Sequence, residues 1–266
     1  MDYGEIISES IEYSRDALAG NRATWLIFII CSLPMALIQF LFDPEKLVDK
    51  TTAAFHWEII PWPQVIGLCV AGFLLSFILS GYIVRVYRGT TPPPVFDRWD
   101  SLYLDGIKLM IVSIIWFIPA LIVFAISVGL LFLGLAGDKP SMVYALAALV
   151  FLLAAFVLMV VAGLFSTLGV IRFARTGSIR EGVRYSAIAE TIGGIGWVVY
   201  IIALIVLFLV GIIFSIAVMV LAIIPFIGWI LVLVVNPFMQ VLEARYISRV
   251  YDHGAPPVPV AVPATP

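Results

Sequence analysis

The sequence predicts an all-α integral membrane protein with six transmembrane helices and both termini in the cytoplasm. Three observations support this fold class. Hydrophobic residues make up 63% of the 266 residues and charged residues only 12%, whereas soluble domains have about 45–50% and about 25%. The uncharged residues fall into runs long enough to cross a bilayer. Lys and Arg are concentrated in alternate connections between these runs, as the positive-inside rule describes.

The composition also excludes several classes of protein. A soluble fold of this length could not bury so much apolar surface. The net charge of −2 and the absence of a basic, aromatic-rich face argue against nucleic-acid binding. Cys31 and Cys69 lie in apolar runs, where two packing thiols are favoured over a disulfide. The acidic start of the chain differs from a cleavable signal peptide, so the first apolar run is expected to be retained.

Residues 2–19 are expected to form an amphipathic helix. Asp2 is the predicted N-cap, and the apolar stripe contains Ile7, Ile11 and Leu18, flanked by Ile6, Tyr13 and Ala17. The acidic opposite face leaves two alternatives open, a helix at the membrane surface and a helix packed on the protein's own loops.

Six spans follow within a membrane domain at 1–251, each closed by charges, prolines or turn residues. The run at 191–242 holds 52 uncharged residues, roughly 78 Å of helix, which is two crossings. Pro225-Phe-Ile-Gly228 is its predicted turn. Residues 252–266 are proline-rich and are predicted to be a disordered cytoplasmic tail. The predicted spans are about 23–42, 59–84, 109–136, 142–171, 194–222 and 227–244.

Prolines and small residues mark particular faces of the spans. Pro34 and Pro237 are expected to kink the first and last spans, and Pro119 lies in the third. Gly72, Ser76 and Ser80 recur at every fourth position of the second span. Such a face allows helices to approach closely, either within one chain or in a homo-oligomer.

The positive charges determine the orientation. Of the 15 Lys and Arg residues, 12 lie on the side of the termini, and the other side has Lys46, Lys50 and Lys139. If 191–242 crossed only once, this asymmetry would weaken. We therefore expect six spans in the cell membrane with both ends cytoplasmic.

The spacing further suggests three repeats of an amphipathic helix followed by a helical hairpin. Gly20, Gly106 and Gly193 each precede a span, at intervals of 86 and 87 residues. Arg85 and Arg88 recur as Arg172 and Arg175, and Arg245 and Arg249 close the last unit with the same kind of spacing. Internal repeats are common in membrane transport folds, although duplication by itself describes only the fold.

Three hairpins invite comparison with the mitochondrial carriers, but the gate residues of that family are missing after Pro34 and Pro119. The chain more closely resembles the mostly archaeal multispanning proteins of domain of unknown function 4013. The resemblance covers nearly the whole chain except the tail, and it implies no established activity and no catalytic or ligand residues. It rests on Gly81-Tyr82, Arg85, Arg88-Gly89, Pro94-Val-Phe-Asp97, Trp99, Asp105-Gly-Ile-Lys108 and Ile224-Pro-Phe-Ile-Gly228.

No catalytic, cofactor or metal site is predicted, and we expect the protein not to be an enzyme. The uncharged runs carry no ionisable acid or base, and no hydrolase, zinc or nucleotide motif occurs. His56 and His253 are expected on opposite sides of the membrane, too far apart to share a metal. Hydroxyl groups within the spans are expected to bond their own helix or a neighbour.

The arginines that close the spans are the candidate site, with two interpretations. They can set the topology and anchor at phosphate headgroups. The sharper hypothesis is that Arg85, Arg88, Arg172 and Arg175 meet and contact an anionic lipid headgroup. Membrane lipids are therefore the expected partners, together with a second copy of the chain, and no small-molecule substrate is identified.

The sequence favours a non-enzymatic protein that organises the bilayer. The alternative is a transporter or channel for a neutral or amphiphilic solute, opened by kinks at Pro34, Pro119 and Pro237. A continuous polar cavity lined by Gln39, Asn236 and Gln240 would support transport, and a dry interior would support the organising role.

Overall fold

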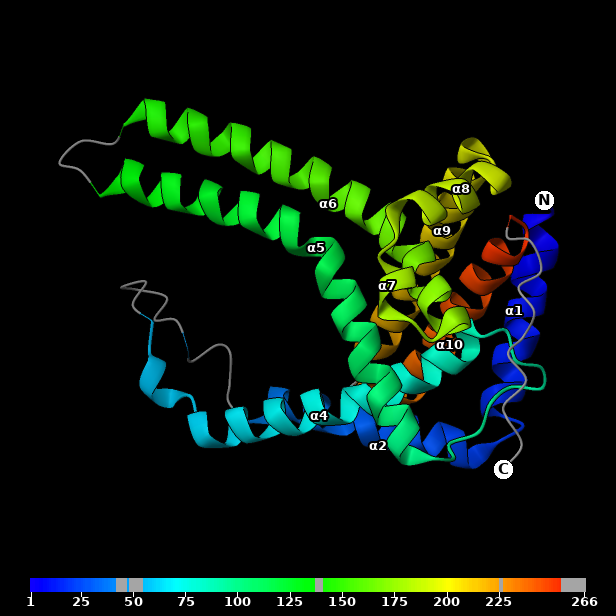
Figure 1. Ribbon diagram of the computed structural model, residues 1–266. Helices are drawn as coiled ribbons and strands as arrows, with labels where there is room; N and C mark the ends of the chain where they lie inside the picture. Colours follow the sequence, from blue (N-terminus) through cyan, green and yellow to red (C-terminus); the bar gives the residue numbers. More distant parts are fainter. Residues whose placement is uncertain (42–46, 48–54, 137–140, 225–226, 255–266) are drawn as a thin grey trace. The chain divides into compact units, whose positions relative to one another are not determined.

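The computed structural model describes residues 1–41, 47, 55–136, 141–224 and 227–254 of the chain, and all regular elements among them are helices (Figure 1). Residues 42–46, 48–54 and 137–140, the turn residues Pro225 and Phe226, and the predicted tail from residue 255 lie outside the described residues. The elements are α1 (Tyr3–Leu18), α2 (Arg22–Leu37), η1 (Ile38–Phe40), η2 (Trp57–Ile59), α4 (Trp62–Tyr87), α5 (Trp99–Leu135), α6 (Met142–Thr176), α7 (Ile179–Gly182), α8 (Tyr185–Ile195), α9 (Trp197–Ala222) and α10 (Gly228–Asp252).

Six of these helices are long and apolar enough to cross a membrane, which confirms the predicted number: Arg22–Phe40, α4, α5, α6, α9 and α10. The protein is therefore a multi-pass membrane protein. The helix α5 is longer than the span predicted for it, because the amphipathic segment before Gly106 continues into the span without a break. Between α8 and α9, in contrast, Gly196 takes a φ of 91° that interrupts the helix.

The chain divides into two compact units. The first contains residues 1–107 and 197–250, and the second contains 108–196 and the chain from 251 onward. The first unit thus holds α1, α2, α4, the start of α5, α9 and nearly all of α10. The second unit holds most of α5 together with α6, α7 and α8.

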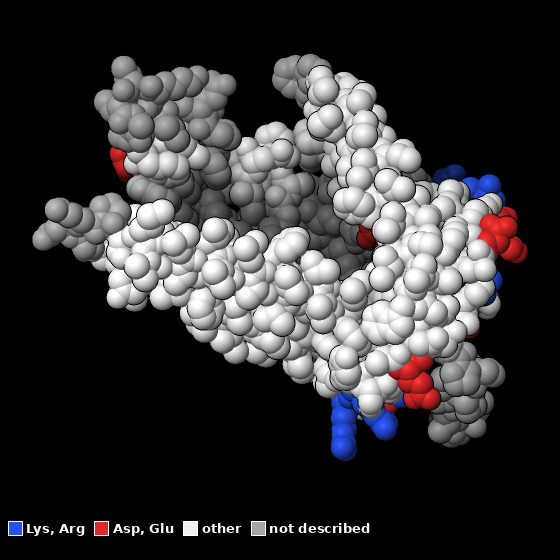
Figure 2. All heavy atoms as spheres, turned by 90° about the horizontal axis from the view of Figure 1, so that it is seen from above, with Lys and Arg blue, Asp and Glu red and all other residues white. Residues whose placement is uncertain are grey.

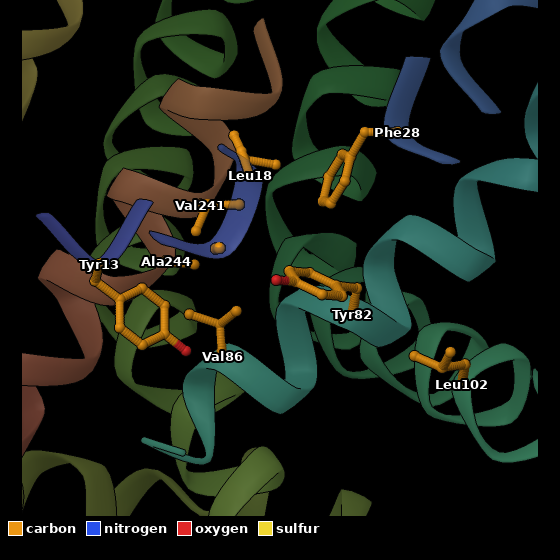
Figure 3. Close-up of a cluster of buried hydrophobic side chains, with 9 residues drawn as sticks. Tyr13, Leu18, Phe28, Tyr82, Val86, Leu102, Val241 and Ala244 are labelled. Carbon is orange, nitrogen blue, oxygen red and sulfur yellow. The ribbon is translucent and has the colours of Figure 1, made fainter. Parts of the chain in front are cut away.

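The core of the first unit surrounds α1 (Figure 3). The helix α1 packs mainly on other helices of the chain, whereas one alternative named its loops. Asp2 caps it as predicted, accepting a hydrogen bond from the Glu5 backbone N–H at 3.1 Å. The core cluster comprises Tyr13, Ala17 and Leu18 of α1, Phe28 of α2, Tyr82 and Val86 of α4, Leu102 of α5, and Val241 and Ala244 of α10.

The buried stripe of α1 is shifted from the expected one. Ile11 is exposed, while Ser10 and Ser14 are fully buried. Each of these serines satisfies its hydroxyl by donating to the carbonyl four residues earlier, at 2.7 Å. Small side chains with internally satisfied hydroxyls let the helix lie close against its neighbours, so they occupy the face that the larger Ile11 was expected to share.

Two glycines bring α4 and the start of α5 into close contact. A Cβ atom on Gly81 would lie 1.9 Å from the carbonyl oxygen of Leu102, and one on Gly106 would lie 1.9 Å from that of Phe77. Any side chain at either position would therefore collide with the backbone of the facing helix. Gly72 is buried against Met35 of α2, so this part of the small-residue face serves packing within the chain.

In the second unit, α5 and α6 run side by side (Figure 1). Small residues recur every seven positions on both helices: Ser113, Ala120, Ser127 and Gly134 on α5, and Ala148, Ala155, Ala162 and Gly169 on α6. All of them are buried except Ser113, which is half-buried. Ser127 Oγ donates across the pair to the carbonyl of Ala148 at 2.7 Å. We call these eight residues the heptad seam; a repeat of seven keeps one face of a helix against its partner over several turns.

Outside these contacts the spans expose their apolar side chains. Only Tyr200 and Ala203 of α9 are buried, and Phe132 near one end of α5 is 69% exposed. On the face shown in Figure 2, charged side chains gather in a few places and most of the surface is uncharged. Such a surface requires lipid as its solvent.

Candidate functional site

Arg85 is the most deeply buried of the four predicted site residues. It lies in the last turn of α4, and its side chain is only 8% exposed. Its guanidinium forms an ion pair with Asp97 and donates to the backbone carbonyls of Val95 at 2.8 Å and Asp97 at 2.7 Å. A planar group with five donors suits such a cluster of acceptors. Arg85 therefore fixes the connection between α4 and α5.

Arg88, one turn further along, reaches Asp105 of α5, with 2.6 Å between Nη2 and Oδ2. The close crossing at Gly81 and Gly106 brings α4 and α5 near enough for this pair. Asp105 directly precedes Gly106. One short segment of α5 therefore supplies both the glycine that lets the helices approach and the carboxylate that pairs with Arg88.

Arg85 and Arg88, with Asp97 and Asp105, form the first arginine cluster. The second arginine cluster is built around Arg172 and Arg175 at the end of α6. Arg172 donates from two nitrogens to the same carboxylate oxygen of Glu181, at 2.6 Å and 3.1 Å. Arg175 pairs with Asp252 at 2.8 Å. Glu181 also accepts from Arg184. Ser178, which precedes α7, makes no side-chain capping bond, and the Glu181 carboxylate is directed to arginines instead.

The third cluster involves one acid and two arginines. Glu9 of α1 pairs with Arg245 and Arg249 of α10, each at 2.7 Å. The Arg245 side chain is only 6% exposed, and its guanidinium lies over the ring of Tyr13, 4.5 Å from the centroid. Ser248 of α10 donates to the carbonyl of Tyr87 at 3.3 Å. The last helix is thereby tied to α1 and α4.

The arginines shift the pKa values of their acidic partners. Burial of Glu9 raises its pKa, but the hydrogen bond from Arg245 and the charges of Arg249 and Arg245 outweigh it, so the pKa lies below its ordinary 4.5. The hydrogen bond from Arg172 is the main cause that holds the pKa of Glu181 below 4.5. Both carboxylates are therefore ionised at neutral pH, and the ion pairs are intact there.

Each arginine of the predicted site thus has a carboxylate partner within its own unit. Arg85 and Arg88 belong to the first unit, and Arg172 and Arg175 to the second. Their contact with an anionic lipid headgroup stays a prediction. Chemically, the pairs can fix helix ends and connections, because buried arginine–carboxylate pairs are strongly directional.

Sequence reasoning did not identify the acidic partners, although a signal was present. Each arginine pair is matched by an acid on a surface segment: Asp97 follows the first pair, Glu181 follows the second, and Glu9 on α1 serves the third. An acid in each amphipathic segment could have been assigned to the arginine pair that precedes it, with the last pair returning to α1.

A second feature that sequence reasoning missed is a carboxylate on α10. Glu243 is exposed and lies on the same helix face as Asn236 and Gln240, at intervals of four and three residues. It borders a groove lined mainly by apolar side chains of α9. Gln39, by contrast, donates to the carbonyl of Ala36 on its own helix.

The other candidates for chemistry are dispersed. His56 contacts Glu58 at 3.1 Å, and Cys31 and Cys69 are free thiols. Within the described part of the chain, no group of three or more His, Cys, Asp or Glu residues is placed to hold a metal ion.

The comparisons with known proteins add one result. A family model described as a protein of unknown function, DUF4013, matches residues 65–224. The match begins in α4 and ends just after α9. It contains the whole first arginine cluster and, of the second, Arg172, Arg175 and Glu181, whereas Asp252 lies outside it. No curated protein and no solved structure matches the chain.

Proposed function

The chain belongs to the DUF4013 family of proteins of unknown function, and we propose that it is a non-enzymatic membrane protein that organises the surrounding bilayer. One observation carries this proposal, the length of the apolar hairpin formed by α5 and α6. Residues 109–135 and 142–171 are uncharged and helical. At about 1.5 Å per residue they measure roughly 40 Å and 45 Å, against a hydrocarbon core of roughly 30 Å.

A hydrophobic hairpin longer than the bilayer core must tilt, bend or thicken the membrane around it. Bending of α5 accommodates part of the excess helix length. The helix contains Pro119 and bends along its length in Figure 1. At the start of α6, near the far end of the hairpin, apolar side chains are strongly exposed, with Met142 and Val143 both at 76%. Lipid has to cover these side chains, so the hairpin favours a thick bilayer.

The polar groups within the spans support a structural role. Ser76, Ser113 and Thr167 each donate to a carbonyl of their own helix. The arginines are engaged with carboxylates. A partner copy of the chain would extend the ordered patch of lipid.

The test is the thickness of reconstituted bilayers. The full chain is placed in vesicles whose lipids differ only in acyl-chain length, and small-angle X-ray scattering measures thickness against the protein-to-lipid ratio. We expect the protein to thicken thin bilayers and to leave thick ones unchanged. No change in thickness at any chain length would overturn the proposal.

A matched variant shortens the hairpin; it removes Gly134 and Ala148 from the seam but keeps the seven-residue spacing of the other six seam residues. Deleting 128–134 and 142–148 removes one heptad, about 10 Å, from each helix. The heptad seam keeps its register because the deleted length equals its repeat. This variant should fold and should lose most of the thickening.

The competing proposal is a transporter or channel for a neutral or amphiphilic solute. It is supported by the exposed face of α10 that carries Asn236 and Gln240. Uptake of glycerol, glucose and a labelled long-chain alcohol into the same vesicles distinguishes the two. Saturable, protein-dependent uptake would favour transport over the organising role.

A further inference from the structure

A groove between α9 and α10 is a concave feature that the arginine clusters do not explain. It encloses about 640 Å³. Gly211 opens its floor, since a Cβ atom there would lie 3.8 Å from Met239 Cε of α10. The lining residues are Leu204, Leu207, Phe208, Gly211, Ile212, Phe214, Ser215, Ile216 and Met219 of α9, with Met239 and Glu243 of α10.

The groove has the length of a hydrocarbon chain. From Leu204 to Met219 it follows α9 over 15 residues, or about 22 Å of helix rise. That is about two-thirds of the roughly 30 Å hydrocarbon core. Apart from Ser215 and Glu243 the walls are apolar, so an extended alkyl chain is the shape and chemistry that fills it.

One end of the groove carries a negative charge. The helices α9 and α10 run antiparallel, with Met239 at Gly211 and Tyr246 Oη bonded to the carbonyl of Ala203. Glu243 therefore lies at the Leu204 end, which is the end near the cluster of Glu9, Arg245 and Arg249. A carboxylate bordering an apolar wall in a membrane span is costly unless it is protonated or a cation compensates its charge.

No side chain in the described part of the chain supplies that cation. The nearest arginines on α10, Arg245 and Arg249, are both committed to Glu9. Glu243 forms no ion pair with a described residue, and the groove has no Lys or Arg in its lining. The titratable group that faces Glu243 from a neighbouring helix is Tyr87 of α4, which carries no positive charge.

We propose that this groove binds an amphiphile with an ammonium head group, whose nitrogen pairs with Glu243 and whose chain lies along α9. The source can be a membrane lipid with an amino head group or a free long-chain amine. The proposal goes beyond the organising function and does not depend on it, because bilayer thickening is assigned to α5 and α6.

The first experiment compares two probes that differ only in the head group. The full chain in an uncharged maltoside detergent is titrated with hexadecylamine and with hexadecanol, and the dissociation constants are measured calorimetrically. We expect the amine to bind about tenfold more tightly or better, since a charge-assisted hydrogen bond contributes about 1.5–3 kcal/mol. Equal affinities would overturn the proposal.

Variants then locate the site. Glu243→Gln keeps the shape of the side chain and should weaken the amine to the level of the alcohol. Glu190→Gln removes an exposed acid of α8 outside the groove and should change neither constant. Gly211→Val narrows the floor and should weaken both probes. An unchanged preference for the amine in Glu243→Gln would place the amine elsewhere and refute the assignment.

The source of the head group is tested in lipid. The chain is extracted from vesicles containing equal amounts of phosphatidylethanolamine and phosphatidylglycerol with identical acyl chains, and the retained lipids are quantified. Preferential retention of phosphatidylethanolamine that Glu243→Gln abolishes identifies a lipid occupant. Without that preference, the tighter binding of hexadecylamine assigns the groove to a single-chain amine. In either case, loss of bilayer thickening would leave the binding result unaffected.

Discussion

At the scale of single residues, Glu9 is the most heavily used acid of the first unit. One carboxylate accepts from both Arg245 and Arg249, and Arg245 also stacks over Tyr13. The Arg245 side chain is nearly inaccessible, so its charge depends on Glu9 for compensation. Removing one partner of a buried ion pair leaves the other charge uncompensated, which costs more than an exposed pair contributes.

Glu9→Gln should therefore destabilise the protein by about 2 kcal/mol, less than the full cost of breaking a buried pair because Glu9 itself is partly exposed. Unfolding of the purified chain in mixed micelles at pH 7 measures the loss. Glu12→Gln on the same helix is the control. The side chains of Glu12 and Arg15, its partner, are both about 70% exposed, so the effect should stay within about 0.5 kcal/mol.

The pH dependence of this difference provides a check on its origin. The folded-state pKa of Glu9 lies below its ordinary 4.5. The stabilisation is therefore complete above about pH 4.5 and is lost as the pH falls through the folded-state value. The gap between the wild type and Glu9→Gln should be constant from pH 7 to pH 5.5 and should narrow at lower pH. A gap that persists in acid would show that the variant acts through packing.

At the scale of elements, the heptad seam explains why α5 and α6 form a hairpin. In lipid, apolar side chains alone do not drive helices together, so close backbone approach and interhelical bonds have to supply the attraction. The buried alanines of α6 and the bond from Ser127 to Ala148 supply both. Trp116 adds a contact near the other end, stacking on Phe165 and donating to the carbonyl of Gly182 at 3.0 Å.

Ala155→Leu should disturb the seam, because Ala155 is 2% exposed and three added carbons must separate the helices. We expect a loss of about 1–3 kcal/mol, measured as a lower midpoint of thermal unfolding in detergent. Ala154→Leu is a matched change on the exposed face of the same turn and should leave the midpoint unchanged. Similar shifts in both variants would contradict the role given to the seam.

At the scale of the whole molecule, the six membrane-capable helices of the described residues fit the prediction that the two ends of the chain lie on one side of the membrane. The arginine clusters close α4, α6 and α10, which are the three helices predicted to end in the cytoplasm. Charges that are fixed by ion pairs at these ends also resist transfer through the bilayer. The predicted topology and the ion pairs therefore depend on the same arginines.

This topology is tested with an impermeant maleimide in intact cells. Cys31 and Cys69 are replaced by alanine, and single cysteines are introduced as Glu5→Cys, His253→Cys and Ser141→Cys. We expect Ser141→Cys to be labelled in intact cells and the other two only after permeabilisation. If Glu5→Cys and His253→Cys react from opposite sides, the six-span orientation is wrong.

Much of the fold could be predicted because it follows from solvent and length. Uncharged runs bounded by charge indicate spans in any sequence, and Asp2 followed by Glu5 indicated the start of α1. The seven-residue spacing of small residues along α5 and α6 is a sequence signal for the seam. The partners of the arginines were harder to predict, since Glu9 and Arg245 are 236 residues apart.

By itself, the sequence determined that the chain spans the membrane six times, because the cost of placing charge and unpaired backbone in lipid depends only on composition and length. Only the tertiary structure decided which acid neutralises each arginine and which acid is left facing an apolar groove. Those outcomes depend on helices far apart in sequence meeting at close range, as α1 and α10 do at Glu9 and Arg245, and the residue pattern of a single helix does not specify its neighbour.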